Sequence, residues 1–249
     1  MVDTNSRLGE IAKNNKGTEM KIIAYKKQSD IDVEFLDEHH YIKQHSTYTN
    51  FIKGEIKNPF DRITFGIGYL GTDEGIWNVN TPKVQYNTWK DMIERCCVEN
   101  TKDKFSHCYD EVTCCDEWLC YKNFDEWYRK NIYEIPNGER IHLDKDIKYK
   151  GNKVYSPYHC ILVPQSINEQ FKENNRKRKD ADLPYTVHRK SNGKYEASYR
   201  GVSLGAFDTV EESAESYKKA KKKNIVELVS KYDNMPEEVK QIILNAEIR

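Results

Sequence analysis

The sequence predicts an α+β protein made of successive small modules. Short β-rich runs fill the first part of the chain, and polar and apolar residues alternate in the segment DIDVEF. Apolar residues at helical spacing follow in the middle, and short strands with a helix close the chain. We expect a small β module at 1–60, a central domain at 81–170, a basic linker at 171–184, and a three-stranded sheet with a helix and a helical tail at 185–249.

The overall charge gives no sign of a polyanionic partner, because the 249 residues carry 40 basic and 40 acidic side chains. A balanced total can still contain a local basic patch. No apolar run approaches the roughly 20 residues of a membrane span. The N-terminal segment MVDTNSRLGEIAKNNKG also lacks the apolar core of a signal peptide. We therefore expect a soluble, intracellular protein without a membrane partner.

Seven cysteines are spaced too irregularly for the paired C-x-x-C knuckles of a zinc ribbon. Stable disulfides are not expected in an intracellular protein. The prediction is therefore free, buried thiols, with no structural Zn²⁺. A site that draws on Cys96, Cys115 and Cys160 is the alternative that the sequence leaves open.

The first module is predicted to be a small β-barrel-like unit from Gly17 to Pro59. Strands are expected at 20–25 and 31–37, and Gly54 lies in the segment that closes the module. Two roles stay open for this module. It is either a structural cap or an additional DNA clamp, whose basic side would carry Lys43, Lys53 and Lys57.

Two helices are predicted in the central domain. The segment NTWKDMIERCC places Trp89, Met92 and Ile93 at helical spacing, and the segment 115–133 places a second apolar stripe on one helix face. That stripe consists of Trp118, Tyr121, Phe124 and Tyr128. Such stripes usually pack into a core, so we expect these aromatic residues to be buried rather than to form a ligand cage.

A hairpin and a helix are predicted in the segment IHLDKDIKYKGNKVYSPYHCILVPQSIN, which runs from Ile141 to Asn168. We expect a strand, a turn at Gly151-Asn152, a second strand, and a helix opened by Ser156-Pro157. This order of elements is the layout of a one-metal nuclease hairpin.

Three strands are predicted between 185 and 207, with Asn192-Gly193 as a type I′ hairpin turn and a second turn at Gly201. Side chains alternate across a sheet, so one face is apolar and is expected to meet the following helix. That face carries Val187, Tyr195, Ala197, Tyr199, Val202 and Leu204. The other face is polar and suits base edges and phosphates. It carries His188, Lys190, Ser198, Arg200 and Ser203, with Asn192 at the turn.

A long helix is predicted after these strands. Thr209 and Glu212 form a capping box, and apolar spacing extends the helix toward Tyr232. Pro236 is expected in the first turn of a final helix. Before the strands, a basic run predicts contacts with phosphates, and a solvated linker is its alternative. The run is Arg176, Lys177, Arg178 and Lys179.

The C-terminal residues resemble a known family. The segment GKYEASYRGVSLGAFDTVEESAESY is similar to the plant ethylene-response-factor type of DNA-binding domain, which also occurs in phage and bacterial mobile-element proteins. The resemblance covers about residues 185–223, and it implies that the polar face of the sheet lies in the major groove of duplex DNA. The matching positions are Gly193, Lys194, Ala197, Arg200, Leu204, Gly205, Phe207, Thr209, Glu211 and Ala214. Base preference does not transfer, because His188 stands where the family often has arginine, and Asn192 and Ser203 stand where it has tryptophan.

The central residues resemble a second group of proteins. The patterns W..MIERC, CCDEWLCYKNFDEW, LDKDI and GNKVYSP..CILVP..IN, between Trp89 and Asn168, are similar to phage and bacterial proteins related to HNH homing endonucleases. The resemblance implies a ββα-metal frame and a mobile-element origin. It also implies the cytoplasm of a bacterial or phage-infected cell as the setting.

Nucleases of this kind use a divalent ion to stabilise charge on the phosphate, and a general base, normally histidine, to activate water. The position of that histidine, at the end of the first strand, is occupied here by Asp144-Lys145-Asp146. We expect Mg²⁺ at Asp144, Asp146 and His159. The catalytic set is then Asp144, Lys145 as a phosphate holder, and His142 as a displaced base. The alternative is that the two carboxylates are ordinary turn and strand residues.

The sequence therefore predicts a protein that binds duplex DNA with sequence preference and derives from an HNH homing-type endonuclease. Its nuclease centre is expected to be weak or lost, which would suit a regulatory role. The first alternative is an active Mg²⁺-dependent homing or nicking endonuclease. The second is a protein-interaction factor that inhibits a host or phage enzyme. No small-molecule substrate is expected.

Overall fold

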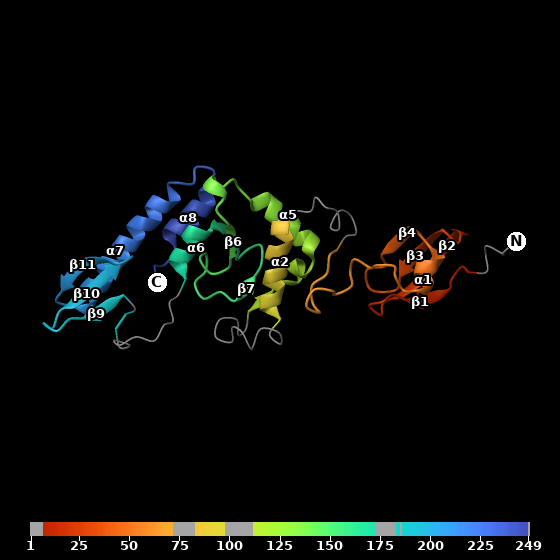
Figure 1. Cartoon of the computed structure of the whole chain (residues 1–249), viewed down its shortest axis with the longest axis horizontal. Coiled ribbons are helices and arrows are strands. Elements are labelled where there is room, and N and C mark those ends of the chain that lie inside the picture. The colour runs from red at the N-terminus through yellow and green to blue at the C-terminus, as the bar shows by residue number, and fades with distance from the viewer. Residues whose placement is uncertain (1–6, 72–82, 98–111, 173–182, 185, 249) are drawn as a thin grey trace. The chain divides into compact units, whose positions relative to one another are not determined.

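The computed structural model describes residues 7–71, 83–97, 112–172, 183–184 and 186–248. It confirms the α+β class, with helices and several small sheets along the chain (Figure 1). The chain divides into two compact units, Met1–Tyr128 and Arg129–Arg249. The sequence predicts a linker between two domains at 171–184, whereas residues on both sides of this linker belong to the second unit. The central hairpin and the C-terminal sheet therefore belong to one body.

The first unit begins with a four-stranded antiparallel sheet in the order β1-β2-β3-β4. Its strands are β1 (Ile11–Lys13), β2 (Glu19–Lys27), β3 (Asp30–Phe35) and β4 (Ile42–Ser46), and the short helix α1 (Tyr48–Ile52) follows. The two strands expected from the sequence correspond to β2 and β3. Buried and less buried residues alternate throughout β3 and in the first half of β2, as a sheet with one covered face requires.

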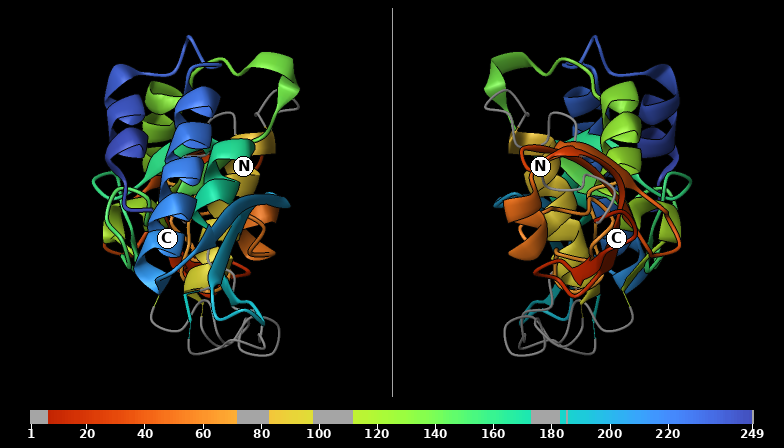
Figure 2. Two further views of the ribbon diagram at one scale, coloured as in Figure 1. Left: turned by 90° about the vertical axis from the view of Figure 1, so that its left-hand side faces the viewer. Right: turned by 90° about the vertical axis from the view of Figure 1, so that its right-hand side faces the viewer.

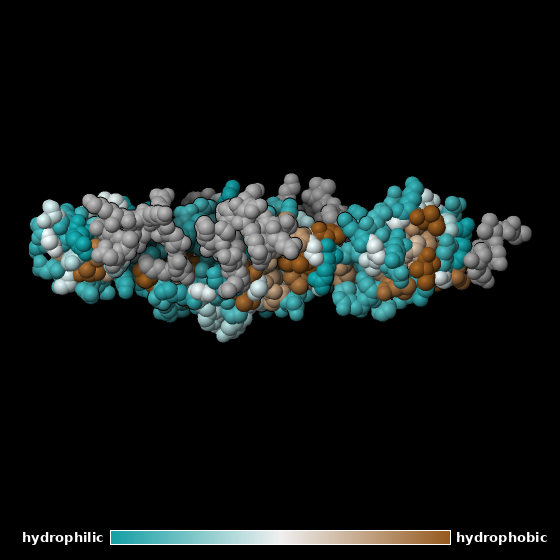
Figure 3. All heavy atoms as spheres, turned by 90° about the horizontal axis from the view of Figure 1, so that it is seen from below, coloured by the Kyte–Doolittle hydropathy of each residue, from teal (hydrophilic) through white to brown (hydrophobic). Residues whose placement is uncertain are grey.

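The buried side of this sheet forms a core of its own together with α1. Its members are Met20, Ile22, Ile31, Val33, Phe35, Phe51 and Ile56. Several other apolar residues of the module remain on its surface, where Figure 3 shows hydrophobic patches among hydrophilic residues. Ile11, Ile42 and Ile52 are the most exposed of these isoleucines, at 57%, 46% and 56%.

The remaining elements described in the first unit are α2 (Lys83–Cys96), β5 (Thr113–Cys114), α4 (Asp116–Leu119) and most of α5 (Tyr121–Asn131), whose last turn belongs to the second unit. One helix was expected where α4 and α5 stand. The helix is interrupted because Cys120 takes an extended conformation and forms a parallel bridge with Tyr69. The backbone of Tyr69 accordingly bonds on both sides of Cys120, donating to Leu119 and accepting from Tyr121, at 2.9 Å each.

The aromatic stripe of these helices is buried, as predicted. Trp118, Tyr121, Phe124 and Tyr128 are all at most 2% exposed. Trp89, Met92 and Ile93 of α2 are fully buried as well, and the indole of Trp89 donates to the carbonyl of Trp118 at 2.8 Å. These residues form a core and no ligand cage.

The second unit forms a hairpin in the predicted segment, but its second strand is β8 and not the strand expected after Gly151-Asn152, and its helix begins later than expected. The elements are the 3-10 turn η1 (Pro136–Gly138), β6 (Ile141–Asp144), β7 (Val154–Tyr155), β8 (Ile161–Pro164) and α6 (Gln165–Phe171). Strand β8 pairs antiparallel with β6, and α6 follows it directly.

Ser156-Pro157 opens only one turn and no helix. The hydroxyl of Ser156 accepts the N–H of His159 at 3.2 Å, and its carbonyl accepts the N–H of Cys160 at 3.0 Å. The apolar residues that follow then enter the sheet as β8, in which all four residues are buried. His159 and Cys160 therefore do not lie on the helix, contrary to the expectation.

A three-stranded antiparallel sheet and two helices complete the second unit. The strands are β9 (Val187–Arg189), β10 (Tyr195–Tyr199) and β11 (Val202–Phe207), in the order β11-β10-β9. The helices are α7 (Val210–Val229) and α8 (Glu237–Asn245). The capping box predicted at the start of α7 is present. Pro236 stands at the N-cap of α8, one position before the first turn.

The two turns of this sheet differ from the prediction. At the first turn only Gly193 has a positive φ, and its N–H donates to the carbonyl of Lys190, so Asn192-Gly193 is not a type I′ pair. The pair with positive φ at both residues is Arg200 (51°) and Gly201 (80°), between Tyr199 and Val202. A primed two-residue turn therefore connects β10 to β11.

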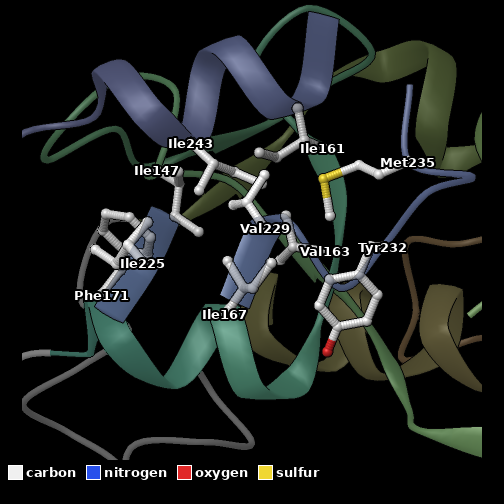
Figure 4. Close-up of a cluster of buried hydrophobic side chains, with 10 residues drawn as sticks. All are labelled: Ile147, Ile161, Val163, Ile167, Phe171, Ile225, Val229, Tyr232, Met235 and Ile243. Atoms are coloured by element: carbon white, nitrogen blue, oxygen red, sulfur yellow. The ribbon is translucent and has the colours of Figure 1, made fainter. Parts of the chain in front are cut away.

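One apolar core joins the hairpin to the C-terminal helices (Figure 4). Residues of the hairpin and α6 supply half of it, and residues of α7, the following turn and α8 supply the other half. The members are Ile147, Ile161, Val163, Ile167, Phe171, Ile225, Val229, Tyr232, Met235 and Ile243. Helices α6, α7 and α8 lie beside one another around this core (Figure 2). Because the core is shared, the hairpin and the sheet module are held in a fixed arrangement.

A polar network reinforces this junction. The carboxylate of Glu139 accepts hydrogen bonds from the hydroxyl of Tyr232 and from the N–H of Ser166. The hydroxyls of Ser166 and Tyr232 lie 2.8 Å apart. Burial raises the pKa of Glu139, but the bonds from Tyr232 and Ser166 outweigh it and the net shift is downward. The start of α6 is thereby fixed to the end of α7.

None of the helices in the described ranges combines the length and apolar character needed to cross a bilayer.

Candidate nucleic-acid interface

The hairpin brings His142 and Asn168 together. His142 lies on β6 opposite Val163 of β8, and Asn168 lies in α6, which packs against both strands. The amide nitrogen of Asn168 is 3.0 Å from Nδ1 of His142. With the amide donating, Nδ1 accepts and the ring proton of a neutral imidazole stands on Nε2. In that tautomer the basic Nδ1 is occupied by the amide and Nε2 carries a proton. A general base requires the reverse arrangement, in which the amide oxygen accepts the Nδ1–H.

Asp144 has a structural task at the end of β6. Its Oδ1 accepts the N–H of Asp146 at 2.9 Å and that of Ile147 at 2.7 Å. Burial raises the pKa of Asp144, and the neighbouring carboxylate of Asp146 raises it further. The side chain therefore supports the turn that leaves the strand, which agrees with the alternative interpretation of this carboxylate as an ordinary turn residue.

Lys145 is engaged within the same loop. Its ammonium group donates to the carbonyl of Asn152 at 2.9 Å and lies 3.7 Å from the carboxylate of Asp146. Only 14% of the Lys145 side chain is exposed. The predicted role as a phosphate holder would require this bond to the loop to break.

The predicted Mg²⁺ ligands are not brought together. His159 lies in the turn before β8, where its Nδ1 is 2.7 Å from the hydroxyl of Ser156. Within the described ranges, three ligand side chains gather inside 4.8 Å at a different place, in the first unit. The donor set of Asp144, Asp146 and His159 therefore does not fit one Mg²⁺ ion, and no hydrolytic step through a metal follows from it.

The cluster in the first unit consists of Asp30, Asp32 and His45. The ring Nδ1 of His45 is 3.0 Å from Asp30, and the His45 N–H donates to Asp32 at 3.0 Å. The bond from His45 lowers the pKa of Asp30, with a smaller contribution from Lys26. These interactions account for the cluster without an ion.

The cysteines form no such cluster in the part of the chain that the structure describes. None of the six cysteines in that part forms a disulfide, and only Cys120 and Cys160 are buried. The expectation of general burial was wrong for four of them, because they lie at the ends of α2 and β5. These four are Cys96, Cys97, Cys114 and Cys115.

The C-terminal sheet has the predicted polar face, and Glu196 belongs to it as well. Strand register pairs His188 with Glu196 and Ser198 with Ser203, so these four side chains share a face. Val187 and Ala197 are fully buried on the opposite face, toward α7. The expectation for that opposite face fails at Val202, which is 65% exposed beside the turn.

Glu196 occupies the middle of the polar face. Its carboxylate accepts the hydroxyl of Ser203 at 2.8 Å and the ammonium of Lys190 at 3.1 Å. The bonds from Ser203 and then from Lys190 lower the pKa of Glu196. The face therefore carries a fixed carboxylate, which compensates the charge of Lys190.

Arg200 lies away from the polar face. It stands in the primed turn, and its guanidinium donates at 3.0 Å to Asn224 of α7, the helix behind the sheet. Alternation along β10 placed it on the polar face, but the strand ends at Tyr199 and the positive φ of Arg200 redirects the side chain.

The remaining predicted contacts lie at the edge of the face or outside the described residues. Asn192 is exposed in the first turn, where its side chain accepts the N–H of Lys194 at 3.2 Å. The basic run Arg176, Lys177, Arg178 and Lys179 lies outside the described residues.

A hollow of about 330 Å³ lies in the first unit. The rings of His39 and Phe60 stack there at 3.9 Å, and Tyr69 lies 5.9 Å from each. The lining also includes Lys16, Thr18, Asp37, Glu38, Asp61, Arg62 and Ile63. Because charges of both signs line this hollow, they define no single class of ligand.

No protein-family model, curated protein or solved structure matches this chain. The two resemblances therefore depend on the residues quoted for them.

Two residues of the site, Glu196 and Asn168, were not predicted from the sequence. Glu196 was detectable, because alternation between Tyr195 and Ala197 places it on the polar face. Asn168 was not, because the helix was expected to begin at Ser156-Pro157.

Proposed function

We propose that this protein binds duplex DNA with sequence preference through the polar face of β9, β10 and β11, and that its nuclease-like hairpin acts as a support without cleaving DNA. The observation that carries the proposal is the shared face of His188, Ser198 and Ser203 around the fixed carboxylate of Glu196. Hydroxyl, imidazole and carboxylate groups are suited to base edges in the major groove.

The proposed loss of cleavage is supported by the state of the hairpin residues. The Asp144 carboxylate supports a turn, Lys145 bonds to the loop backbone, and His159 bonds to Ser156. These three residues of the expected chemistry thus each have a partner within the hairpin.

An active metal-dependent endonuclease is the second candidate, because Asn168 lies within hydrogen-bond distance of His142 Nδ1. With the Asn168 amide turned over, its oxygen would accept the Nδ1–H and leave Nε2 unprotonated, as a general base requires. Descent from an HNH homing-type enzyme is compatible with either function.

The test is a selection of duplexes from a random pool by the full-length chain, with and without Mg²⁺. A supercoiled plasmid that carries the selected site is then incubated with the protein and Mg²⁺ or Mn²⁺. We expect enrichment of a site and a plasmid that stays supercoiled. Failure to enrich any sequence at low salt would contradict DNA binding. Relaxation of the plasmid by wild type but not by His142→Ala would establish the second candidate instead.

A further inference from the structure

We propose that Tyr149 and Tyr158, on the loop between β6 and β8, form a stacking platform for an unstacked nucleobase of bound DNA. This inference rests on the proposed function, because it names a second DNA-contacting surface in the same unit. The ligand class is a single-stranded or locally unpaired deoxynucleotide.

The two rings are stacked and open to solvent. Their centroids are 5.4 Å apart with planes inclined by 20°, and their hydroxyls bond at 2.6 Å. His159 lies edge-on to both rings, at 5.5 and 5.1 Å. Tyr158 is nevertheless 64% exposed and Tyr149 38% exposed. Part of the surface of this ring pair therefore remains accessible to a planar ligand.

The loop holds these rings in place. The side-chain amide of Asn152 donates to the carbonyls of Lys145 and Val154 at 2.7 and 2.8 Å. The ammonium group of Lys148 donates to the carbonyl of Tyr158 at 2.7 Å. Because the rings are ordered before a ligand arrives, binding loses little side-chain entropy.

The charge beside the rings favours a nucleotide over an apolar partner. The ammonium group of Lys148 lies 4.7 Å from the centroid of Tyr158 and 5.5 Å from that of Tyr149. Aromatic rings with an adjacent cation are the combination that binds a base together with its phosphate. Bases inside a duplex have both faces covered by neighbours, so the platform fits a base that has left the stack.

The test compares three DNAs with the full-length chain: an oligothymidylate, an abasic strand of the same length, and the selected duplex. Wild type is expected to bind the oligothymidylate more tightly than the abasic strand. Tyr158→Leu keeps an apolar side chain but removes the planar ring. It should lose about 5- to 150-fold in affinity for the oligothymidylate, the range for one base on one ring. Tyr158→Phe retains the ring and should stay within about twofold of wild type.

The duplex separates this inference from the proposed function. Tyr158→Leu should bind the duplex as wild type does, because the sheet face is intact. Equal affinity of wild type for the oligothymidylate and the abasic strand would overturn the platform while leaving duplex binding in place. The platform is also overturned if Tyr158→Phe is as defective as Tyr158→Leu, since the hydroxyl would then matter and not the ring. Absence of duplex binding by wild type would remove the proposed function and this inference together.

Discussion

The phenol of Tyr199, in the C-terminal sheet, donates a hydrogen bond of 2.8 Å to Oε1 of Gln170, in the helix of the nuclease-like hairpin. Asn224 of α7 donates to the same oxygen at 3.3 Å and accepts from Arg200 at 3.0 Å. The sheet, its covering helix and the hairpin are thus connected by side chains as well as by a shared core.

Removing the Tyr199 hydroxyl should weaken this connection. Tyr199→Phe is expected to lower the free energy of unfolding of the second unit by about 1 kcal/mol, the usual value of one such bond. The measurement is urea unfolding of the full-length chain by circular dichroism. A double-mutant cycle with Gln170→Ala isolates the pair. A coupling energy indistinguishable from zero would show that the bond does not join the two parts.

Substitutions at Asp144 separate a turn-supporting role from a catalytic one. Asp144→Ala should destabilise the protein by about 1–2 kcal/mol, because two backbone N–H groups lose their acceptor. Asp144→Asn retains an acceptor oxygen and avoids a buried charge. Thermal unfolding of the three proteins between pH 4 and 7 checks this expectation.

The pH dependence follows from the raised pKa of Asp144. A carboxyl group whose pKa is higher in the folded state stabilises the fold while protonated, and this contribution is lost as the pH rises through the folded-state pKa. The advantage of Asp144→Asn over wild type should therefore grow from pH 4 to pH 7. The matched control is Asp146→Asn, which removes the second cause of the shift and should reduce the effect. An advantage that shrinks with pH would contradict the assignment.

Neutralising Glu196 should strengthen binding to duplex DNA of any sequence. Glu196→Gln removes a negative charge from the face and releases Lys190 from its ion pair. One additional phosphate contact by Lys190 would steepen the slope of log affinity against log salt by about 0.9. Fluorescence anisotropy at several salt concentrations measures both quantities. Unchanged affinity and slope would mean that this carboxylate does not face DNA.

Substitution of Arg200 should affect mainly stability, whereas substitution of His188 should affect mainly the preference for the selected DNA site. Arg200→Ala loses a charged hydrogen bond at an exposed site and should lower stability by about 0.5–1.5 kcal/mol while changing preference for the selected site little. His188→Ala should leave stability nearly unchanged and reduce that preference by about 1–3 kcal/mol if the ring contacts a base. Melting temperatures and competition binding distinguish the two. The opposite pattern would place Arg200 on the reading surface.

The sequence predicted those elements whose signals are local. The capping box of Thr209 and Glu212 marks the start of α7, and the aromatic stripe of α4 and α5 identifies the core. Long-range contacts were not visible in this way. The bridge from Tyr69 that interrupts the helix at Cys120 joins segments far apart in the chain.

For the candidate site, too, local patterns were informative and the backbone contacts were not visible in the sequence. Alternation correctly grouped His188, Ser198 and Ser203, but it failed at Arg200, where a positive φ ends the strand geometry. The metal set failed because a serine followed by proline resembles a helix start, although here it closes a single turn before β8. Residue types alone do not reveal which carboxylate the backbone has already engaged.

The most direct test of DNA reading by the sheet is the affinity of a sheet-face variant for selected and scrambled duplexes. The variant combines His188→Ala, Ser198→Ala and Ser203→Ala in the full-length chain. The control is Val202→Ala, an exposed residue at the start of β11 in the same sheet. We expect the triple variant to fold and to lose most of the difference in affinity between the two duplexes, while the control retains it. Retention of the full difference by the triple variant would contradict the claim that this face reads DNA.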